Sequence, residues 1–158
     1  MATARSWEIP FVVKALGIGL AIAALLFLAP RPSAHADSEL SVLTSAIRVI
    51  DGDTIEDQAA DVTYRLENID TPETGPRARC TAERDAGARA TARVRMLIAS
   101  AQSFDIRPTG RIDRYGRTIA FVRVDGADLG ETLISQGLAR PWRGRREPWC
   151  AADGSLLP

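Results

Sequence analysis

The spacing of apolar and polar residues between positions 46 and 124 predicts a strand-rich domain. Five stretches combine β-branched residues with alternation of apolar and polar side chains. They are 46–50, 51–55, 62–66, 104–107 and 118–124. Asp51 and Gly52 form a turn signal, so we expect the first three stretches to be antiparallel strands. Residues 113–117 are expected to connect the last two as a hairpin.

Two further segments have the spacing of amphipathic helices. The segment 83–100 is rich in alanine and arginine, and its apolar residues recur at helical intervals. They are Ala86, Ala90, Val94, Leu97, Ile98 and Ala101. A shorter helix is predicted after Asp128, an N-cap with Glu131 three residues further on, and Gly137 predicts its end. Together these elements predict an α+β fold, a small closed five-stranded β-barrel with two packed helices.

The first 36 residues have the three parts of a targeting segment. Arg5 and Lys14 lie in a basic N-terminal part, an apolar run of 15 residues follows at 15–29, and small residues at 34–36 suit cleavage before residue 37. The alternative is an uncleaved anchor over residues 11–29, since a membrane span needs about 20 apolar residues. In either case we expect export to the periplasm or the cell exterior.

Export changes the expected state of the two cysteines, Cys80 and Cys150. Thiols in oxidising compartments persist as disulfides, so we predict a Cys80–Cys150 bridge, with two free thiols as the alternative. Residues 141–158, which we name the C-terminal segment, are rich in Arg, Pro and Gly and are expected to be irregular and pinned by this bridge. The predicted organisation is a targeting segment at 1–36, a linker at 37–44, a domain at 45–150 and a tail at 151–158.

Composition limits the chemistry of the exported part. The chain has 158 residues with 20 basic and 20 acidic side chains, yet its one lysine, Lys14, and its one histidine, His35, precede residue 37. Histidine-activated nucleophiles, histidine zinc sites, P-loop lysines and Schiff bases are therefore excluded from residues 37–158. Catalysis there has to use carboxylates and arginines.

Charge is divided along the exported part. Residues 37–73 hold ten acidic side chains and two arginines, whereas residues 74–158 hold fifteen arginines and nine acidic side chains. Folding can interleave these charges without any consequence for function. The functional alternative is that acidic side chains bind a divalent cation while arginines bind an anionic substrate such as a phosphate-bearing polymer.

Three polar clusters stand out, and each taken singly has a structural explanation. Residues 51–54, DGDT, fit a hairpin turn as readily as a metal site. Residues 70–73, DTPE, fit the start of a helix, with Thr71 as its cap and Pro72 in its first turn. Residues 113–117, DRYGR, fit a solvated turn.

In their order and context, these clusters resemble the staphylococcal nuclease (thermonuclease) family across residues 45–141. The matching blocks are VIDGDTI at 49–55, YRLENIDTPE at 64–73, DRYGRTIAFV at 113–122 and LISQGLAR at 133–140. The resemblance implies a five-stranded OB-fold-like barrel with two helices, and a nuclease-like domain at 45–150. It also implies a Ca²⁺-dependent phosphodiesterase, an endonuclease or exonuclease that hydrolyses DNA or RNA.

The resemblance further implies which residues bind the cation. Asp53 and Asp70 would bind one Ca²⁺ through their carboxylates, and Thr71 would bind it through its backbone carbonyl. Hard oxygen ligands of this kind suit Ca²⁺, which polarises phosphate and orients water without histidine or thiolate.

The catalytic groups that the resemblance implies are a carboxylate and two arginines. Glu73 matches the carboxylate that contacts or activates the attacking water, and it acts either as a general base or by positioning that water. Arg65 and Arg117 match the arginines on the scissile phosphate, where charge-assisted hydrogen bonds strengthen in the transition state.

Other matching positions concern the substrate. Arg114 and Tyr115 correspond to positions beside the bound nucleotide, with a structural hairpin tyrosine as the alternative. The expected substrate is single-stranded or frayed DNA or RNA, and the expected protein is a monomer. Trp142 and neighbouring arginines would suit single strands as a basic aromatic platform, although Trp142 and Trp149 would equally cover the open end of the barrel.

Departures from the family sustain a second hypothesis. The family continues after residue 140 into a long helix, whereas residues 141–150 read PWRGRREPWC. The segment between Glu73 and the first helix is also short. The alternative is therefore a barrel retained as a nucleic-acid or protein binding module without turnover. Because such relatives typically lose the carboxylates, the presence of Asp53, Asp70 and Glu73 favours the enzyme.

Overall fold

The computed structural model describes residues 44–157 of the chain. The targeting segment predicted at 1–36 lies outside the described residues, as does the predicted linker except for its last residue. Within residues 44–157, no helix is both long enough and apolar enough to cross a membrane.

A sheet of six strands forms the body of the described residues. Its members are β1 (Ile47–Asp51), β2 (Thr54–Asp57), β3 (Val62–Leu66), β5 (Phe104–Ile112), β6 (Thr118–Val124) and β7 (Ala127–Asp128). Their order in space is β1-β2-β3-β6-β5, with β7 paired to β6. Neighbours are antiparallel except β3 and β6, which pair in parallel with Tyr64 opposite Thr118.

Both predicted helices are present. They are α3 (Thr81–Ala99) and α4 (Leu129–Ser135). The sulfur of Cys80 caps α3 by accepting a hydrogen bond from the backbone amide of Glu83. As predicted, α4 begins after Asp128, whose carboxylate accepts a hydrogen bond from the amide of Glu131 at 2.9 Å. These caps satisfy amides that would otherwise lack a partner at the helix starts.

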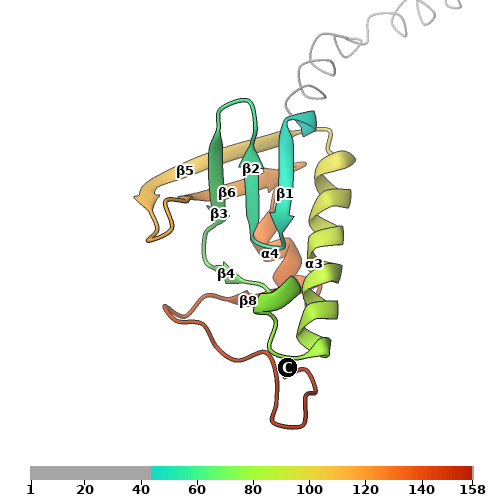
Figure 1. Ribbon diagram of the computed structural model, residues 1–158. Helices are drawn as coiled ribbons and strands as arrows, with labels where there is room; N and C mark the ends of the chain where they lie inside the picture. Colours follow the sequence, from blue (N-terminus) through green and yellow to red (C-terminus); the bar gives the residue numbers. More distant parts are fainter. Residues whose placement is uncertain (1–43, 158) are drawn as a thin grey trace, which may run out of the picture. The chain divides into compact units, whose positions relative to one another are not determined.

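The predicted α+β class, the five strands and the two helices are confirmed, but the closure of the barrel is not. Hydrogen-bonded pairing among the described residues ends at β1 on one side of the sheet and at β5 on the other. In Figure 1, β5 and β6 run across β1, β2 and β3, and α3 packs beside β1. Periodicity predicts strands one at a time, so it contains no information on whether the first and last strands pair.

Strand β5 extends beyond the predicted stretch 104–107, as far as Ile112. Pro108 and Gly110 interrupt the alternation in this region, and the register with β6 shifts between Pro108 and Ile112. An irregularity of this kind lets a strand continue through residues that break the period of two. The connection at 113–117 then joins β5 to β6 as predicted.

The sheet and both helices share one hydrophobic core. Ile55 of β2, Val94 of α3, Val122 of β6 and Leu133 of α4 are at most 1% exposed. Full burial of such a side chain contributes about 1.5–3 kcal/mol relative to exposure. This packed body fixes the strand ends, where the polar clusters of the sequence lie.

Residues 70–73 form a strand end and a loop, so the chain does not adopt the helix start that was the structural alternative for this cluster. Strand β4 (Ile69–Asp70) ends at this point, and the next helical turn is the 3-10 helix η1 (Gly75–Arg77). The loop lies tightly against α3, because a Cβ added at Gly87 would be 2.6 Å from the carbonyl oxygen of Pro72. The loop can approach the backbone of α3 this closely because residue 87 is a glycine and has no side chain.

The C-terminal segment folds back onto this loop. Strand β8 (Arg140–Pro141) pairs with β4, and beyond it the chain is irregular apart from a bridge between Cys150 and Leu156. Cys80 and Cys150 form a disulfide with a Cα–Cα distance of 6.2 Å. The predicted disulfide and the irregular, pinned segment are both confirmed.

Removal of the disulfide is expected to lower the free energy of unfolding by about 4 kcal/mol, because the bond restricts the unfolded chain over a sequence separation of 70 residues. Replacing Cys80→Ser together with Cys150→Ser keeps a side-chain acceptor at the N-cap of α3. Urea unfolding of the oxidised protein and of the double variant measures the difference. Equal free energies of unfolding would show that the cross-link adds no stability.

Candidate active site

Asp53 lies in the turn between β1 and β2 and is buried, with 7% of its surface exposed. One carboxylate oxygen, Oδ2, accepts hydrogen bonds from the amide of Thr71 at 3.0 Å and from its hydroxyl at 3.1 Å. The other oxygen accepts one from the hydroxyl of Thr54 at 3.0 Å. The DGDT cluster is therefore a hairpin turn that also aims a carboxylate inward at the DTPE cluster.

Arg65 of β3 lies between two carboxylates. Its Nη1 is 3.0 Å from Oδ2 of Asp53, and its Nη2 is 3.8 Å from Oδ1 of Asp70. The guanidinium also donates to the carbonyl oxygen of Ile69 at 2.8 Å. Asp53 from one block of the sequence thus meets Arg65, Asp70 and Thr71 from another at one end of the sheet.

Asp70 receives a second partner from the C-terminal segment. The indole Nε1 of buried Trp149 donates to Oδ2 of Asp70 at 3.0 Å, and the guanidinium of Arg140 stacks 3.6 Å from the Trp149 ring centroid. Burial raises the pKa of Asp70 above its ordinary value, while the charge of Arg146 and the bond from Trp149 oppose this rise. A buried acid beside other acids favours the approach of a cation.

A third carboxylate adds to the negative charge of this region. Asp51, at the end of β1, accepts a hydrogen bond from the amide of Asp53 at 3.2 Å. Burial, and after it the charge of Asp53, raise the pKa of Asp51 to about 6. Like charges held together in a buried site raise the pKa of at least one of them.

The side chains and the carbonyl predicted to bind Ca²⁺ are of the kind that this cation prefers. No group of three or more His, Cys, Asp or Glu side chains in residues 44–157 is arranged to bind a metal. The predicted set is smaller, because it combines the carboxylates of Asp53 and Asp70 with the carbonyl of Thr71. These are hard oxygen donors, and burial, together with the charge of Asp53, raises the pKa values of Asp51 and Asp70 beside them.

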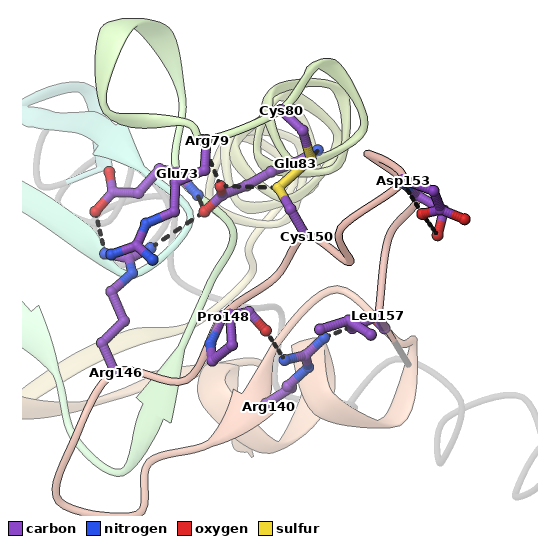
Figure 2. The surroundings of a disulfide bond; sticks show 11 residues. Glu73, Arg79, Cys80, Glu83, Arg140, Arg146, Pro148, Cys150, Asp153 and Leu157 are labelled. Carbon is purple, nitrogen blue, oxygen red and sulfur yellow. Dashed lines mark hydrogen bonds and ion pairs between the residues drawn. A yellow bond between two sulfur atoms is a disulfide. The ribbon is translucent and has the colours of Figure 1, made fainter.

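Glu73 lies on the loop beside this set and is held by two arginines, as Figure 2 shows for one of them. Arg77 of η1 places its Nε 3.3 Å from Oε2 of Glu73. Arg146, from the C-terminal segment, donates to the other oxygen of the carboxylate through Nη1 and lies 3.4 Å from the carbonyl oxygen of Thr71. Arg146 therefore contacts both Glu73 and a predicted metal ligand.

Arg117 reaches the same region from the turn between β5 and β6. Asp113 fixes its guanidinium through bonds of 2.8 and 2.7 Å to Nε and Nη2. Nη1 donates to the hydroxyl of Thr54 at 3.1 Å, and that hydroxyl in turn donates to Asp53. Arg117 is thus linked to the carboxylate cluster through a single threonine.

Arg114 and Tyr115 stand at the outer side of this turn. Tyr115 is 68% exposed, and the guanidiniums of Arg114 and Arg117 lie 4.8 and 5.4 Å from its ring centroid. Arg114 also donates to the Tyr115 hydroxyl at 2.8 Å. Both side chains adjoin Arg117, and in the part of the chain that the structure describes neither contacts the carboxylate of Asp53, Asp70 or Glu73.

Sequence reasoning did not identify the contacts that the C-terminal segment makes. From the sequence, Arg146 was interpreted as one of several basic residues around Trp142. Trp149 was interpreted as covering the open end of the barrel. The structure instead brings Arg146 to Glu73 and Trp149 to Asp70, while Trp142 stays 41% exposed. The one signal that could have indicated this folding back was the predicted disulfide, which ties Cys150 to the start of α3.

Comparison with known proteins agrees with this geometry. The family model of the staphylococcal nuclease homologues matches residues 63–153, and the chain belongs to this family. It is 39% identical over 101 residues to the SPbeta prophage-derived endonuclease YokF of Bacillus subtilis, covering 59% of this chain and 32% of that protein. It is 38% identical over 96 residues to endonuclease YncB of the same organism, covering 59% and 44%. The chain thus matches less than half the length of either relative.

The burial of Asp51 predicts a specific pH dependence of stability in the presence of chelator. Because the folded state holds the Asp51 proton up to about pH 6, against an ordinary value of 3.8, it binds more protons than the unfolded state between these limits. The free energy of unfolding therefore falls as pH rises through this window, and the difference between a pKa of 3.8 and one of about 6 corresponds to about 3 kcal/mol.

Asp51→Asn removes this cost and is expected to gain stability relative to the wild type as pH increases, reaching a plateau above about pH 6. Urea unfolding of both proteins at a series of pH values measures the difference. A difference that does not change with pH would contradict the prediction.

Proposed function

We propose that this protein is a cation-dependent phosphodiesterase that hydrolyses nucleic acid. The observation that carries the proposal is the convergence of Asp53, Arg65 and Asp70 at one end of the sheet, with Glu73 and Arg117 at its margin. The relatives YokF and YncB are named as endonucleases, which supports the same reaction class.

In this proposal Asp53, Asp70 and the carbonyl of Thr71 hold one Ca²⁺. When bound, such a cation polarises a phosphate oxygen and orients water. The protein contributes the rigid placement of the oxygens: Thr71 fixes Asp53 through two hydrogen bonds, and Trp149 fixes Asp70. Ligands held in this way need little reorganisation when the cation arrives.

Arg65 and Arg117 bind the scissile phosphate. Phosphodiester hydrolysis gathers charge on the oxygens around phosphorus, and a planar guanidinium meets two such oxygens at once. Arg65 already lies against Asp53, and Asp113 holds the Arg117 side chain in place. Both cations are therefore oriented before the substrate binds, which favours the transition state.

Glu73 acts on the attacking water, by accepting its proton or by orienting it. The carboxylate is held by side chains of opposite charge on both of its oxygens. The two roles differ in what a neutral isostere can do, because Gln accepts a hydrogen bond from water but does not take its proton.

Arg114 and exposed Tyr115 contact the sugar-phosphate chain next to the cleaved bond. Their position beside Arg117 places a cationic and aromatic surface there, which suits single-stranded or frayed DNA or RNA. Export of a monomeric domain belongs to the same proposal, and the Cys80–Cys150 disulfide supports an oxidising compartment.

The proposal predicts Ca²⁺-dependent cleavage of a single-stranded oligonucleotide by the oxidised protein. Removal of Ca²⁺ by a chelator is expected to abolish cleavage, and Arg117→Ala to lower kcat by roughly 100-fold or more, because a preorganised contact to the transition state is lost. Glu73→Ala is expected to lower kcat similarly. Glu73→Gln retains more activity than Glu73→Ala if the carboxylate orients water, and no more if it takes the proton.

The matched control is Arg89→Ala. Arg89 is an exposed arginine of α3 whose side chain has no hydrogen bond or ion pair among the described residues, so cleavage is expected to be unchanged. Folded wild-type protein that binds the oligonucleotide without cleaving it, in any divalent cation, would overturn the nuclease and support a binding module.

A further inference from the structure

Arg146, from the C-terminal segment, contacts two groups of the loop at residues 71–74, which we call the active-site loop, and one group of α3. It forms an ion pair with Glu73, and its Nη2 lies 3.6 Å from Oε1 of Glu83 (Figure 2). Its Nη2 also lies 3.4 Å from the carbonyl oxygen of Thr71. Its side chain is 38% exposed, so one side of it still meets solvent. A single guanidinium thus links the carboxylate proposed to act on water with a carbonyl proposed to bind the cation.

The C-terminal segment is anchored on both sides of Arg146. Before it, β8 pairs with β4, with Arg140 opposite Asp70. After it, buried Trp149 bonds to Asp70, and Cys150 is bound covalently to Cys80 at the start of α3. Arg146 therefore lies in a short stretch of chain whose two ends are fixed. This lowers the conformational entropy that is lost when Arg146 forms its contacts to the loop.

Glu83 provides the other half of this arrangement. It is 2% exposed and accepts hydrogen bonds from the amides of Glu73 at 3.3 Å and Arg79 at 2.7 Å. A buried carboxylate needs a compensating cation, and among residues 44–157 it is Arg146 whose guanidinium lies near Glu83. Glu83 thus holds the backbone of residue 73 while Arg146 holds its side chain.

Arg77, the other arginine that pairs with Glu73, is less suited to hold the Glu73 side chain in place. Arg77 is 70% exposed, and exposed ion pairs contribute about 0–1 kcal/mol. Arg146 combines the pair to Glu73 with contacts to Thr71 and buried Glu83, so it fixes the carboxylate relative to the loop as a whole.

We propose that Arg146 is a positioning residue, which holds Glu73 and the Thr71 carbonyl in the geometry that the reaction needs, and that the Cys80–Cys150 disulfide keeps it there. The inference rests on the proposed nuclease function. It assigns to the C-terminal segment the task of supporting the active-site loop.

The test compares Arg146→Gln, Arg146→Lys and Arg145→Gln in the full oxidised chain. Arg145 is the adjacent exposed arginine, and its side chain has no hydrogen bond or ion pair among the described residues, so its variant removes the same charge from the segment without removing a contact to the loop. The kcat and KM for a single-stranded oligonucleotide in Ca²⁺ are measured, together with hydrogen exchange of residues 71–74 by mass spectrometry.

Arg146→Gln is expected to lower kcat by about 10- to 100-fold with little change in KM, since misplacement of a reacting group by about 1 Å costs rate rather than binding. Its residues 71–74 should exchange faster than in the wild type. Arg146→Lys should recover part of kcat, because lysine keeps the charge but lacks the fork that reaches several oxygens. Arg145→Gln should keep the wild-type kcat and the wild-type exchange of residues 71–74. Only its KM is expected to change, because Arg145 is one of the arginines next to Trp142 that would suit a single strand.

The role of the disulfide is tested by the same measurements. Replacing Cys80→Ser together with Cys150→Ser is expected to lower kcat. Adding Arg146→Gln to this double variant should lower kcat by a smaller factor than Arg146→Gln does in the oxidised protein, because the effects of coupled contacts are not additive. Losses that multiply would show that the disulfide does not act through Arg146. Circular dichroism establishes that the double variant is folded, and the arginine comparison stands without it.

Several results would overturn the proposal. They are an Arg146→Gln variant with wild-type kcat and exchange, an equal loss in Arg145→Gln, and a faster Arg146→Gln enzyme, which would make the arginine a block on Glu73. Failure of the nuclease function itself has a separate signature, because the wild type would then not cleave at all. The exchange measurement would still report whether Arg146 holds the loop.

Discussion

Negative charge buried at the strand ends has to be compensated, and much of the structure follows from this constraint. Asp53, Asp70 and Glu83 are all at most 7% exposed. An uncompensated buried ion costs several kcal/mol, so each carboxylate requires donors or cations. Those partners come from distant parts of the chain: Arg65 from β3, the loop amides, and Trp149 and Arg146 from the C-terminal segment.

The contacts that compensate the buried carboxylates also place the groups of the candidate active site. The packed core fixes β1, β2 and β3, and the turns at their ends place Asp53 against Thr71. Gly87 lets the loop approach α3 closely, and the disulfide draws the C-terminal segment across it. What results is a set of oxygens held in place beside oriented arginines, which is the arrangement that the proposed phosphodiesterase would require. Membership of the staphylococcal nuclease homologues agrees with this interpretation.

Much of this could be predicted from the sequence because local signals agreed with the fold. The cap at Asp128, the alanine-rich stripe of α3 and the strand alternation each depend on neighbouring residues. The open sheet and the course of β5 beyond Pro108 depend on pairing between distant strands, and Arg146 reaches Glu73 across 73 positions. The periodicity of apolar residues gives no information on contacts between residues that are distant in the sequence. The helix start that was the structural alternative for residues 70–73 is not adopted, because Ile69 and Asp70 pair with β8 and the next helical turn begins only at Gly75.

Calorimetric titration of Ca²⁺ into the oxidised protein tests most directly whether the buried carboxylates form a cation site. Wild type and Arg89→Ala should both show saturable binding at one site, and Asp53→Asn should lose it, because this substitution removes one of the two proposed carboxylate ligands. Absence of binding in the wild type, or unchanged binding in Asp53→Asn, would contradict the role of Asp53 and Asp70 as cation ligands.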